Sequence, residues 1–228
     1  MTDTNLSKKW ILVNIDYTEC FASPDGALTV KEWHLIWVII KDLIDAFKAK
    51  NLPHVFTGDA HPENHISFAS RFWIPQFEYI DGDRKRPDHS IEWTPWASLY
   101  QPFDTWEYKR TIKKWHHIDQ DSYSAFGGVT EDENKTFDEY LQDQEITDIY
   151  LTWLATDYCV WHTALDARKY EHATNLDKVK NPYNVYLITD AVRGVAPETT
   201  AEMMQHMKNA GVIFTTTKEV IATLLAKY

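Results

Sequence analysis

Cysteine is scarce in this chain of 228 residues, which contains only Cys20 and Cys159. Two cysteines so far apart do not make the disulfide framework of a small secreted domain, so we expect both thiols to be reduced. Basic residues are also in deficit, with 23 lysines and arginines against 34 aspartates and glutamates and a net charge of −11. Nucleic acids and anionic membrane surfaces attract clustered positive charge, so neither is expected as a partner.

Long hydrophobic runs are absent as well. Residues 1–9 are polar and lack the apolar core of a secretion signal, and charged residues interrupt the longest helical stretch, residues 32–50. We therefore expect a soluble cytoplasmic protein with no membrane partner. The composition, with 44% hydrophobic and 25% charged residues, suits one globular domain over residues 1–228 and leaves the oligomeric state open, a homo-oligomer included.

The chain does have a regular alternation of strand and helix patterns. Ile11, Val13 and Ile15 alternate as in a buried strand that ends at Asp16, and hydrophobic residues then recur at helical spacing over residues 33–47. Further strands are predicted at residues 53–57, 110–113, 148–154, 184–190 and 212–215, and further helices at 134–142, 157–170, 198–209 and 218–227. This order predicts an α/β fold, a three-layer sandwich with a mostly parallel central sheet flanked by helices.

In such a sheet, ligands bind at the carboxyl ends of the strands. Four candidate groups follow predicted strands: Asp16, Asp59, Lys114 and the thiol of Cys159 in the turn LATDYC. Two connections are longer than usual. Residues 59–108 form a loop long enough to carry function, and residues 171–183 indicate a surface insertion.

The loop at 59–108 opens with the sequence GDAHPENHISF, which places Asp59, His61 and His65 close together. Histidine nitrogens with a carboxylate oxygen suit Zn, Fe or Mn. His89, in the sequence RPDHS, could complete a site that leaves positions open for substrate or water. The alternative is that these are polar loop histidines in a chain that has ten of them.

Cys159 stands where the strand pattern of residues 148–154 gives way to a helical pattern. A thiolate in the first turn of a helix feels the partial positive charge of backbone N–H groups, which lowers its pKa and favours a nucleophile. The alternative is a buried structural cysteine, because free Cys behaves mostly as a small hydrophobe.

Asp16 and Lys114 are the candidate acid–base partners. A carboxylate that closes a hydrophobic strand is only partly solvated, so we expect the pKa of Asp16 to rise enough for it to shuttle a proton. A turn cap is the alternative for this residue. A lysine beside a thiol and a carboxylate favours the anionic form of both, although most lysines are solvated surface charges.

Five motifs, which together cover most of the chain, resemble those of a known family. They are Asp16 with Phe21, the DxHPxxHxSF run from Asp59 to Phe68, RPDHS in place of WPxHC, Lys114 before DSYSAF, and LATDYCV. On these motifs the sequence is similar to the isochorismatase-like cysteine hydrolases and, within them, to the nicotinamidases.

This resemblance implies a catalytic triad of Asp16, Lys114 and Cys159. It also implies an oxyanion site made by the backbone N–H groups of Ala155 and Cys159, and a cis peptide bond between Leu154 and Ala155. The implied reaction is hydrolysis of nicotinamide to nicotinate and ammonia through a thioester, with pyrazinamide as a second small-molecule substrate.

The resemblance further implies one divalent metal ion, zinc first, with iron or manganese as alternatives. Its ligands would be Asp59, His61 and His89, with His65 either binding the metal or supporting a ligand. The ring of the substrate would lie in a pocket whose walls are Phe21, Tyr123 and Arg86.

Four departures from the family pattern are visible. Arg86 stands where the family has the tryptophan that packs on the pyridine ring. Ser90 stands in place of a cysteine, and Trp115 in place of a glycine. The sequence Thr18-Glu19-Cys20 replaces Gln-Asn-Asp. No triad member is lost. Three alternatives stay open: another small amide whose anionic group contacts Arg86, a metal-dependent hydrolase that uses bound water, and a catalytically silent member of the fold.

Overall fold

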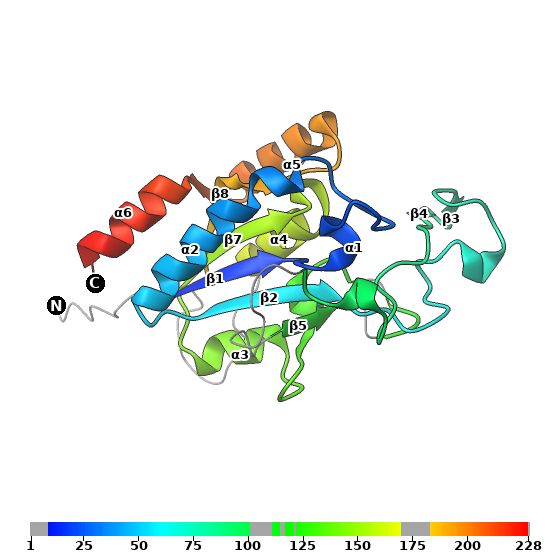
Figure 1. Cartoon of the computed structure of the whole chain (residues 1–228), viewed down its shortest axis with the longest axis horizontal. Helices are drawn as coiled ribbons and strands as arrows, with labels where there is room; N and C mark the ends of the chain where they lie inside the picture. The colour runs from blue at the N-terminus through cyan, green and yellow to red at the C-terminus, as the bar shows by residue number, and fades with distance from the viewer. Residues whose placement is uncertain (1–8, 101–110, 115–116, 121, 170–182, 228) are drawn as a thin grey trace.

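A seven-stranded sheet forms the centre of the computed structural model, which describes residues 9–100, 111–114, 117–120, 122–169 and 183–227 (Figure 1). Its strands are β1 (Trp10–Ile15), β2 (His54–Asp59), β5 (Thr111–Lys114), β6 (Val129–Thr130), β7 (Asp148–Leu154), β8 (Asn184–Arg193) and β9 (Ile213–Thr215). Their order across the sheet is β6-β5-β2-β1-β7-β8-β9. All neighbouring strands are parallel except β5 and β6.

Helices cover both faces of this sheet (Figure 1). On one face lie α2 (Trp37–Ala49) and α6 (Thr217–Lys227); on the other lie α3 (Phe137–Asp143), α4 (Trp161–Lys169) and α5 (Pro197–Asn209). The predicted α/β three-layer sandwich with a mostly parallel sheet is therefore confirmed. Within the described ranges, no helix is both long enough and apolar enough to cross a bilayer.

The hydrophobic pattern of β1 explains why this strand is central. Ile11, Val13 and Ile15 belong to the core on the side of α3, α4 and α5, whereas Trp10 and Leu12 belong to the core on the side of α2 and α6. Successive side chains of a strand point to opposite faces, so a strand covered on both sides is apolar throughout. Every residue of β1 is buried, and its carboxyl end therefore lies inside the molecule.

The first long helix begins later than its sequence pattern predicts. Trp33–Leu35 forms a separate 3-10 turn after Glu32, whose φ of 61° is left-handed, and α2 begins only at Trp37. The buried side chains of α2 keep the predicted helical spacing: Ile40, Leu43, Ile44 and Phe47. The periodicity thus predicts the buried face of the helix correctly but not its first turn.

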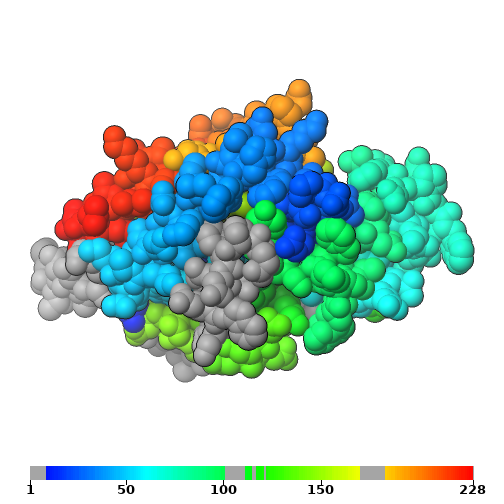
Figure 2. All heavy atoms as spheres, viewed as in Figure 1, coloured from blue at the N-terminus to red at the C-terminus, as the bar shows by residue number. Residues whose placement is uncertain are grey.

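The long connection after β2 folds into short elements beside the sheet. It contains 3-10 turns at Ser70–Phe72 and Pro95–Ala97 and a hairpin of β3 (Tyr79–Ile80) and β4 (Asp83–Arg84). The hairpin lies at the far right of Figure 1, in the lobe drawn in cyan to green in Figure 2. The rest of the predicted loop, residues 101–108, lies outside the described residues, as do residues 171–182 of the predicted insertion.

The start and the end of this connection meet again next to the sheet. The N–H of His61 donates to the carbonyl of Ser90 at 2.9 Å, and the N–H of Glu92 donates to the carbonyl of His61 at 2.8 Å. These backbone hydrogen bonds bring His89 beside His61, although 27 residues separate them in the sequence.

Candidate active site

Three charged side chains converge where neighbouring parallel strands end. Asp16 follows β1, Asp59 ends β2 and Lys114 ends β5, and β2 lies between β1 and β5 in the sheet. Asp59 and Lys114 are directly paired in the strand register. All three side chains are at most 3% exposed. Their positions follow from the parallel topology, because it gathers strand ends at one edge.

The ammonium group of Lys114 holds this cluster together. Its Nζ lies 2.9 Å from Asp16 Oδ1 and 2.8 Å from Asp59 Oδ1, and it donates to the backbone carbonyl of Tyr123 at 3.1 Å. Burial alone would lower the pKa of Lys114, but the charges of Asp16 and Asp59 raise it well above its usual value of 10.5. The lysine therefore stays charged and is shared by two carboxylates.

Asp16 is the carboxylate suited to exchange a proton. Burial and the negative charge of Asp59 raise the pKa of Asp16 to about 6, while Lys114 and a hydrogen bond with Cys159 oppose this rise. Burial also disfavours ionisation of Asp59, but Lys114 and the neighbouring histidines more than offset it and hold the pKa of Asp59 below 3.8. The pKa values of the two carboxylates are therefore shifted in opposite directions. Asp16 is suited to carry a proton, and Asp59 is suited to remain an anion.

Cys159 reaches Asp16 from a π-turn that joins β7 to α4. In this turn, Thr156–Val160, the carbonyl of Ala155 accepts from the N–H of Tyr158 at 3.1 Å and from the N–H of Val160 at 3.2 Å. The helix predicted from residue 157 therefore begins with a wider π-turn. Cys159 is 6% exposed, and its thiol lies close enough to the Asp16 carboxylate for the two groups to shift each other's pKa.

The expected lowering of the thiol pKa by the helix start is wrong. Burial and the negative charge of Asp16 raise the pKa of Cys159 well above 9.0, and the opposing charge of Lys114 does not compensate. The desolvation of a buried thiolate outweighs the partial charge at a helix end. The resting group is therefore a protonated thiol next to a carboxylate.

Two backbone features frame this turn. The peptide bond between Leu154 and Ala155 is cis, where the resemblance implied it. The carboxylate of Asp157 accepts from the N–H of Val195 at 2.9 Å and from the N–H of Ala196 at 3.2 Å. These bonds attach the turn to the start of α5. The position of the Cys159 thiol therefore depends on α5 as well as on α4, which follows the turn.

Next to Lys114, three donor atoms face one another. Asp59 Oδ2 lies 3.8 Å from His61 Nε2 and 3.9 Å from His89 Nε2, and the two Nε2 atoms are 3.1 Å apart. All three side chains are buried, and their donor atoms lie within 4.8 Å of one another. A carboxylate and two imidazoles at such spacing can hold one divalent metal ion and leave coordination positions open.

The protonation of the two histidines suits metal binding. His89 Nδ1 lies 2.8 Å from the carbonyl of Pro87, which can only accept, so Nδ1 carries the hydrogen and Nε2 presents its lone pair. Burial lowers the pKa of His61 to about 4, and burial together with His61 lowers that of His89 well below 6.5. Both rings are neutral at physiological pH.

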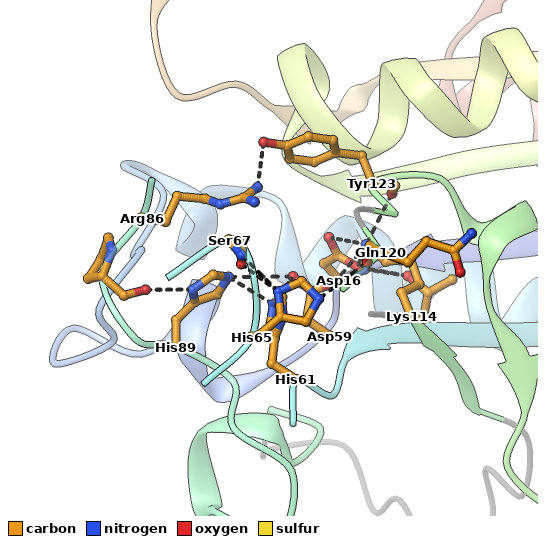
Figure 3. Close-up of polar contacts among 12 residues, drawn as sticks. Asp16, Asp59, His61, His65, Ser67, Arg86, His89, Lys114, Gln120 and Tyr123 are labelled. Atoms are coloured by element: carbon orange, nitrogen blue, oxygen red, sulfur yellow. Dashed lines mark hydrogen bonds and ion pairs between the residues drawn. The ribbon is translucent and has the colours of Figure 1, made fainter. Parts of the chain in front are cut away.

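His65, the fourth predicted ligand, lies beside this group but outside it. Its Nδ1 accepts from the N–H of Ser67 at 3.1 Å, and its Nε2 lies 3.0 Å from the carbonyl of His117 and 3.2 Å from that of Gln120. Protein atoms therefore engage both ring nitrogens (Figure 3). The ring packs against His61 with centroids 4.6 Å apart, which favours support of a ligand over direct binding.

The predicted pocket residues lie near the histidines of the candidate metal site. The ring of Phe21, on α1 (Glu19–Ala22), lies 6.3 Å from that of His89. The guanidinium of Arg86 donates to the hydroxyl of Tyr123, and the two side chains meet above the histidines in Figure 3. Tyr123 also stacks on His162, with centroids 4.9 Å apart and an angle of 11°.

Residues 11–219 match the family profile of the Isochorismatase domain. The chain belongs to the isochorismatase domain family. A nicotinamidase of Escherichia coli (strain K12) is 31% identical to it over 207 residues, which are 88% of this chain and 91% of that protein. Two solved structures are also similar across almost their whole length.

The first of these isochorismatase-type structures is the Acinetobacter baumanii nicotinamidase pyrazinamidease, with 30% identity, a TM-score of 0.76, and coverage of 94% of this chain and 99% of that one. The second is the pyrazinamidase of Pyrococcus horikoshii in complex with zinc, with 32% identity, a TM-score of 0.71, and coverage of 91% and 99%. The family resemblance drawn from the motifs is confirmed.

Two residues of this isochorismatase-family site were not identified from the sequence. They are His162, whose ring stacks on Tyr123, and Thr57, which is hydrogen-bonded to Asp16. His162 lies three residues after Cys159, the spacing that puts two residues on one helix face. Thr57 carries no such local signal. Trp115 and Asp121, both quoted from the motifs, lie outside the described residues.

Proposed function

We propose that the protein is an amidase that hydrolyses nicotinamide to nicotinate and ammonia, with Cys159 as the nucleophile. The observation that carries the proposal is a buried carboxylate, Asp16, which contacts the ammonium of Lys114 at 2.9 Å and lies close enough to the buried thiol of Cys159 for the two groups to shift each other's pKa. A thiol, a base and a fixed cation in contact are the parts that thiol-dependent acyl transfer requires. Membership of the isochorismatase family and the similarity to nicotinamidases support the choice of amide.

In the first half of the reaction, Asp16 takes the thiol proton as the sulfur of Cys159 attacks the amide carbonyl. With a pKa of about 6, Asp16 is mostly ionised at neutral pH and can accept this proton. Lys114 remains charged and offsets the negative charge that moves to the sulfur. The N–H groups of Ala155 and Cys159 would stabilise the oxyanion. Asp16 then protonates the leaving nitrogen, the C–N bond breaks and ammonia departs.

In the second half, water attacks the Cys159 thioester. Asp16 is again a carboxylate and accepts a proton from this water, the C–S bond breaks, and the sulfur recovers the proton to restore the thiol. The products are nicotinate and the free enzyme. The same carboxylate therefore acts as a base and as an acid in each half of the cycle.

Asp59, His61 and His89 would hold one divalent ion, zinc in preference to iron or manganese, and His65 would support His61 by packing against it. When bound, such an ion would supply a coordination position for the pyridine nitrogen of the substrate. The pocket residues Phe21, Tyr123 and Arg86 would then enclose the ring. The chain's own residues carry every proton transfer.

A second candidate substrate is a small amide that bears an anionic group. The side chain of Arg86 favours it, because this guanidinium is 9% exposed and lies near enough to His61 and His89 to lower their pKa values. Ammonia release from nicotinamide, pyrazinamide and a carboxylated pyridine amide, measured side by side, ranks the candidates. Turnover of the carboxylated amide alone would contradict the nicotinamide proposal.

The nucleophile is tested by Cys159→Ala with Cys20→Ala as the matched control, since both cysteines are buried. We expect Cys159→Ala to reduce ammonia release at least about a thousand-fold and to leave the metal content unchanged, and Cys20→Ala to remain active. Activity that survives loss of the Cys159 thiol but not chelation would instead indicate metal-bound water as the nucleophile. Absence of turnover in the wild type with every amide would indicate a silent member of the fold.

A further inference from the structure

Thr57 makes two hydrogen bonds to the catalytic carboxylate residue through one hydroxyl group. This fully buried threonine of β2 accepts from the backbone N–H of Asp16 at 2.8 Å and donates to Asp16 Oδ1 at 2.9 Å. Its carbonyl accepts from the N–H of Tyr17 at 3.1 Å. Thr57 therefore contacts the main chain on both sides of the Asp16 carbonyl and the side chain of Asp16 itself.

Asp16 needs such a support, because its own backbone does not continue the strand. β1 ends at Ile15, and Asp16 has a φ of 55°, in the left-handed region that L-residues seldom adopt. The N–H of Asp16 is satisfied by the Thr57 hydroxyl. The other contact of the carboxylate, Lys114, is a flexible side chain that reaches Oδ1 at 2.9 Å and Oδ2 at 3.1 Å and so does not favour one orientation.

Thr57 does favour one orientation. A β-branched side chain in a strand has a restricted χ1, so its hydroxyl is a rigid reference point. Because Thr57 donates to Oδ1 alone, whereas Lys114 contacts both oxygens, Oδ2 keeps more capacity to accept the thiol proton of Cys159. Rotation of the carboxylate would break the bond from Thr57.

We propose that Thr57 is a positioning residue, which holds the carboxylate of Asp16 in the orientation that receives the proton of Cys159. Thr57 does not contact the sulfur in this scheme and acts only through Asp16. The kinetic part of this inference rests on the proposed amidase function, whereas the structural part does not.

The test compares three variants. Thr57→Val removes the hydroxyl at nearly constant shape, Thr57→Ser restores it, and Thr152→Val is the matched control. Thr152 is likewise fully buried in a strand, and its hydroxyl donates at 2.9 Å to Asn14, which takes no part in the site. Each variant is crystallised, and its kcat and KM for nicotinamide are measured.

We expect the Asp16 carboxylate to rotate in Thr57→Val and kcat to fall about 10- to 100-fold, up to the loss that a misplacement of about 1 Å can cause, with KM within about twofold of wild type. Thr57→Ser should return kcat to within about threefold of wild type, and Thr152→Val should retain activity despite a similar drop in Tm. An Asp16 side chain that superimposes on wild type in Thr57→Val would overturn the proposal, as would an equal loss of kcat in Thr152→Val.

The two readouts separate this inference from the function on which it partly rests. Rotation of Asp16 in Thr57→Val, together with a wild type that releases no ammonia from nicotinamide, would retain the positioning role and reject the nicotinamidase proposal. Full activity of Thr57→Val on nicotinamide would reject the positioning role of Thr57 and retain the nicotinamidase proposal.

Discussion

At the scale of single residues, the site depends on charges that are buried together. Lys114 lies between Asp16 and Asp59 with no exposed side-chain surface, and each carboxylate oxygen that it contacts is within 3.1 Å. Removing one partner from a buried ionic cluster leaves the others uncompensated. We therefore expect the lysine to be required for folding as well as for the proposed catalysis.

Lys114→Met should abolish ammonia release and lower the free energy of unfolding by about 3–5 kcal/mol. Lys113→Met is the control, because Lys113 precedes it in β5 but is partly exposed and pairs with Glu92 and Glu131 at 3.3 Å. Its loss should cost about 1 kcal/mol or less. Urea unfolding of both variants gives the comparison, and equal costs would refute the buried cluster.

The pKa of Asp16 sets the acid limit of the reaction. Because burial raises it to about 6, the fraction of Asp16 able to accept the thiol proton falls about tenfold per pH unit below that value. We expect kcat/KM to be nearly constant just above pH 7 and to decline through pH 6. A pH–rate profile that stays flat down to pH 5 would contradict Asp16 as the base.

The sequence predicts those site residues whose roles depend on local spacing. Asp59, His61 and His65 lie in one motif, and Cys159 lies at a strand-to-helix junction, so each is visible without coordinates. Thr57 and His162 act on residues far away in the sequence, and only the sheet register and the packing of α4 bring them into contact. The raised pKa of Cys159 likewise depends on burial, which a helix-start pattern does not reveal.

At the scale of elements, the proposed nucleophile Cys159 lies in the π-turn Thr156–Val160. Three hydrogen bonds attach this turn to residues at the start of α5. Asp157 accepts from the N–H of Val195, from the N–H of Ala196 and from the hydroxyl of Thr199. The strand and helix patterns of the sequence predict the two elements next to this turn, β7 and α4. They do not predict its π form, which differs from an α-helix by one residue per hydrogen-bonded ring.

Asp157→Ala should lower the free energy of unfolding by about 1–3 kcal/mol, since it removes the charged acceptor of three part-buried hydrogen bonds, and should lower kcat about tenfold by displacing Cys159. Asp190→Ala is the control. Asp190 accepts from the N–H and hydroxyl of Thr217 at 2.9 and 3.0 Å at the start of α6, away from the site. Its loss should affect stability alone, and a fall of kcat in both variants would contradict the positional effect.

At the scale of the whole molecule, the candidate metal site joins the lobe of residues 60–100 to the central sheet. Asp59 ends β2, whereas His61 lies at the start of the segment that forms the lobe and His89 lies in its later part. The alternation of strands and helices predicts the sandwich, but it carries no information on how this non-repetitive segment folds. Only the motif histidines indicate that its ends meet.

Removal of the metal should therefore affect stability and activity together. A free ion at about 100 times its Kd stabilises the folded state by about 2.7 kcal/mol, so we expect chelation to lower Tm and stop ammonia release, and zinc to restore both. His61→Ala should lose the ion, as measured by elemental analysis, whereas the exposed His206→Ala should keep it. Full metal occupancy in His61→Ala would refute the ligand set.

The two oxygens of the Asp59 carboxylate contact different groups. Oδ1 lies 2.8 Å from Lys114, and Oδ2 faces the two histidines. We therefore expect a variant at this position to change the affinity of the candidate metal site and to remove one counter-charge of Lys114 at the same time. In a genetic screen for activity, substitutions of Asp59 should therefore not be tolerated, because each one removes both a metal ligand and a partner of Lys114. His61 and His89 are the positions at which metal loading can be varied while the ion pairs of Lys114 stay intact.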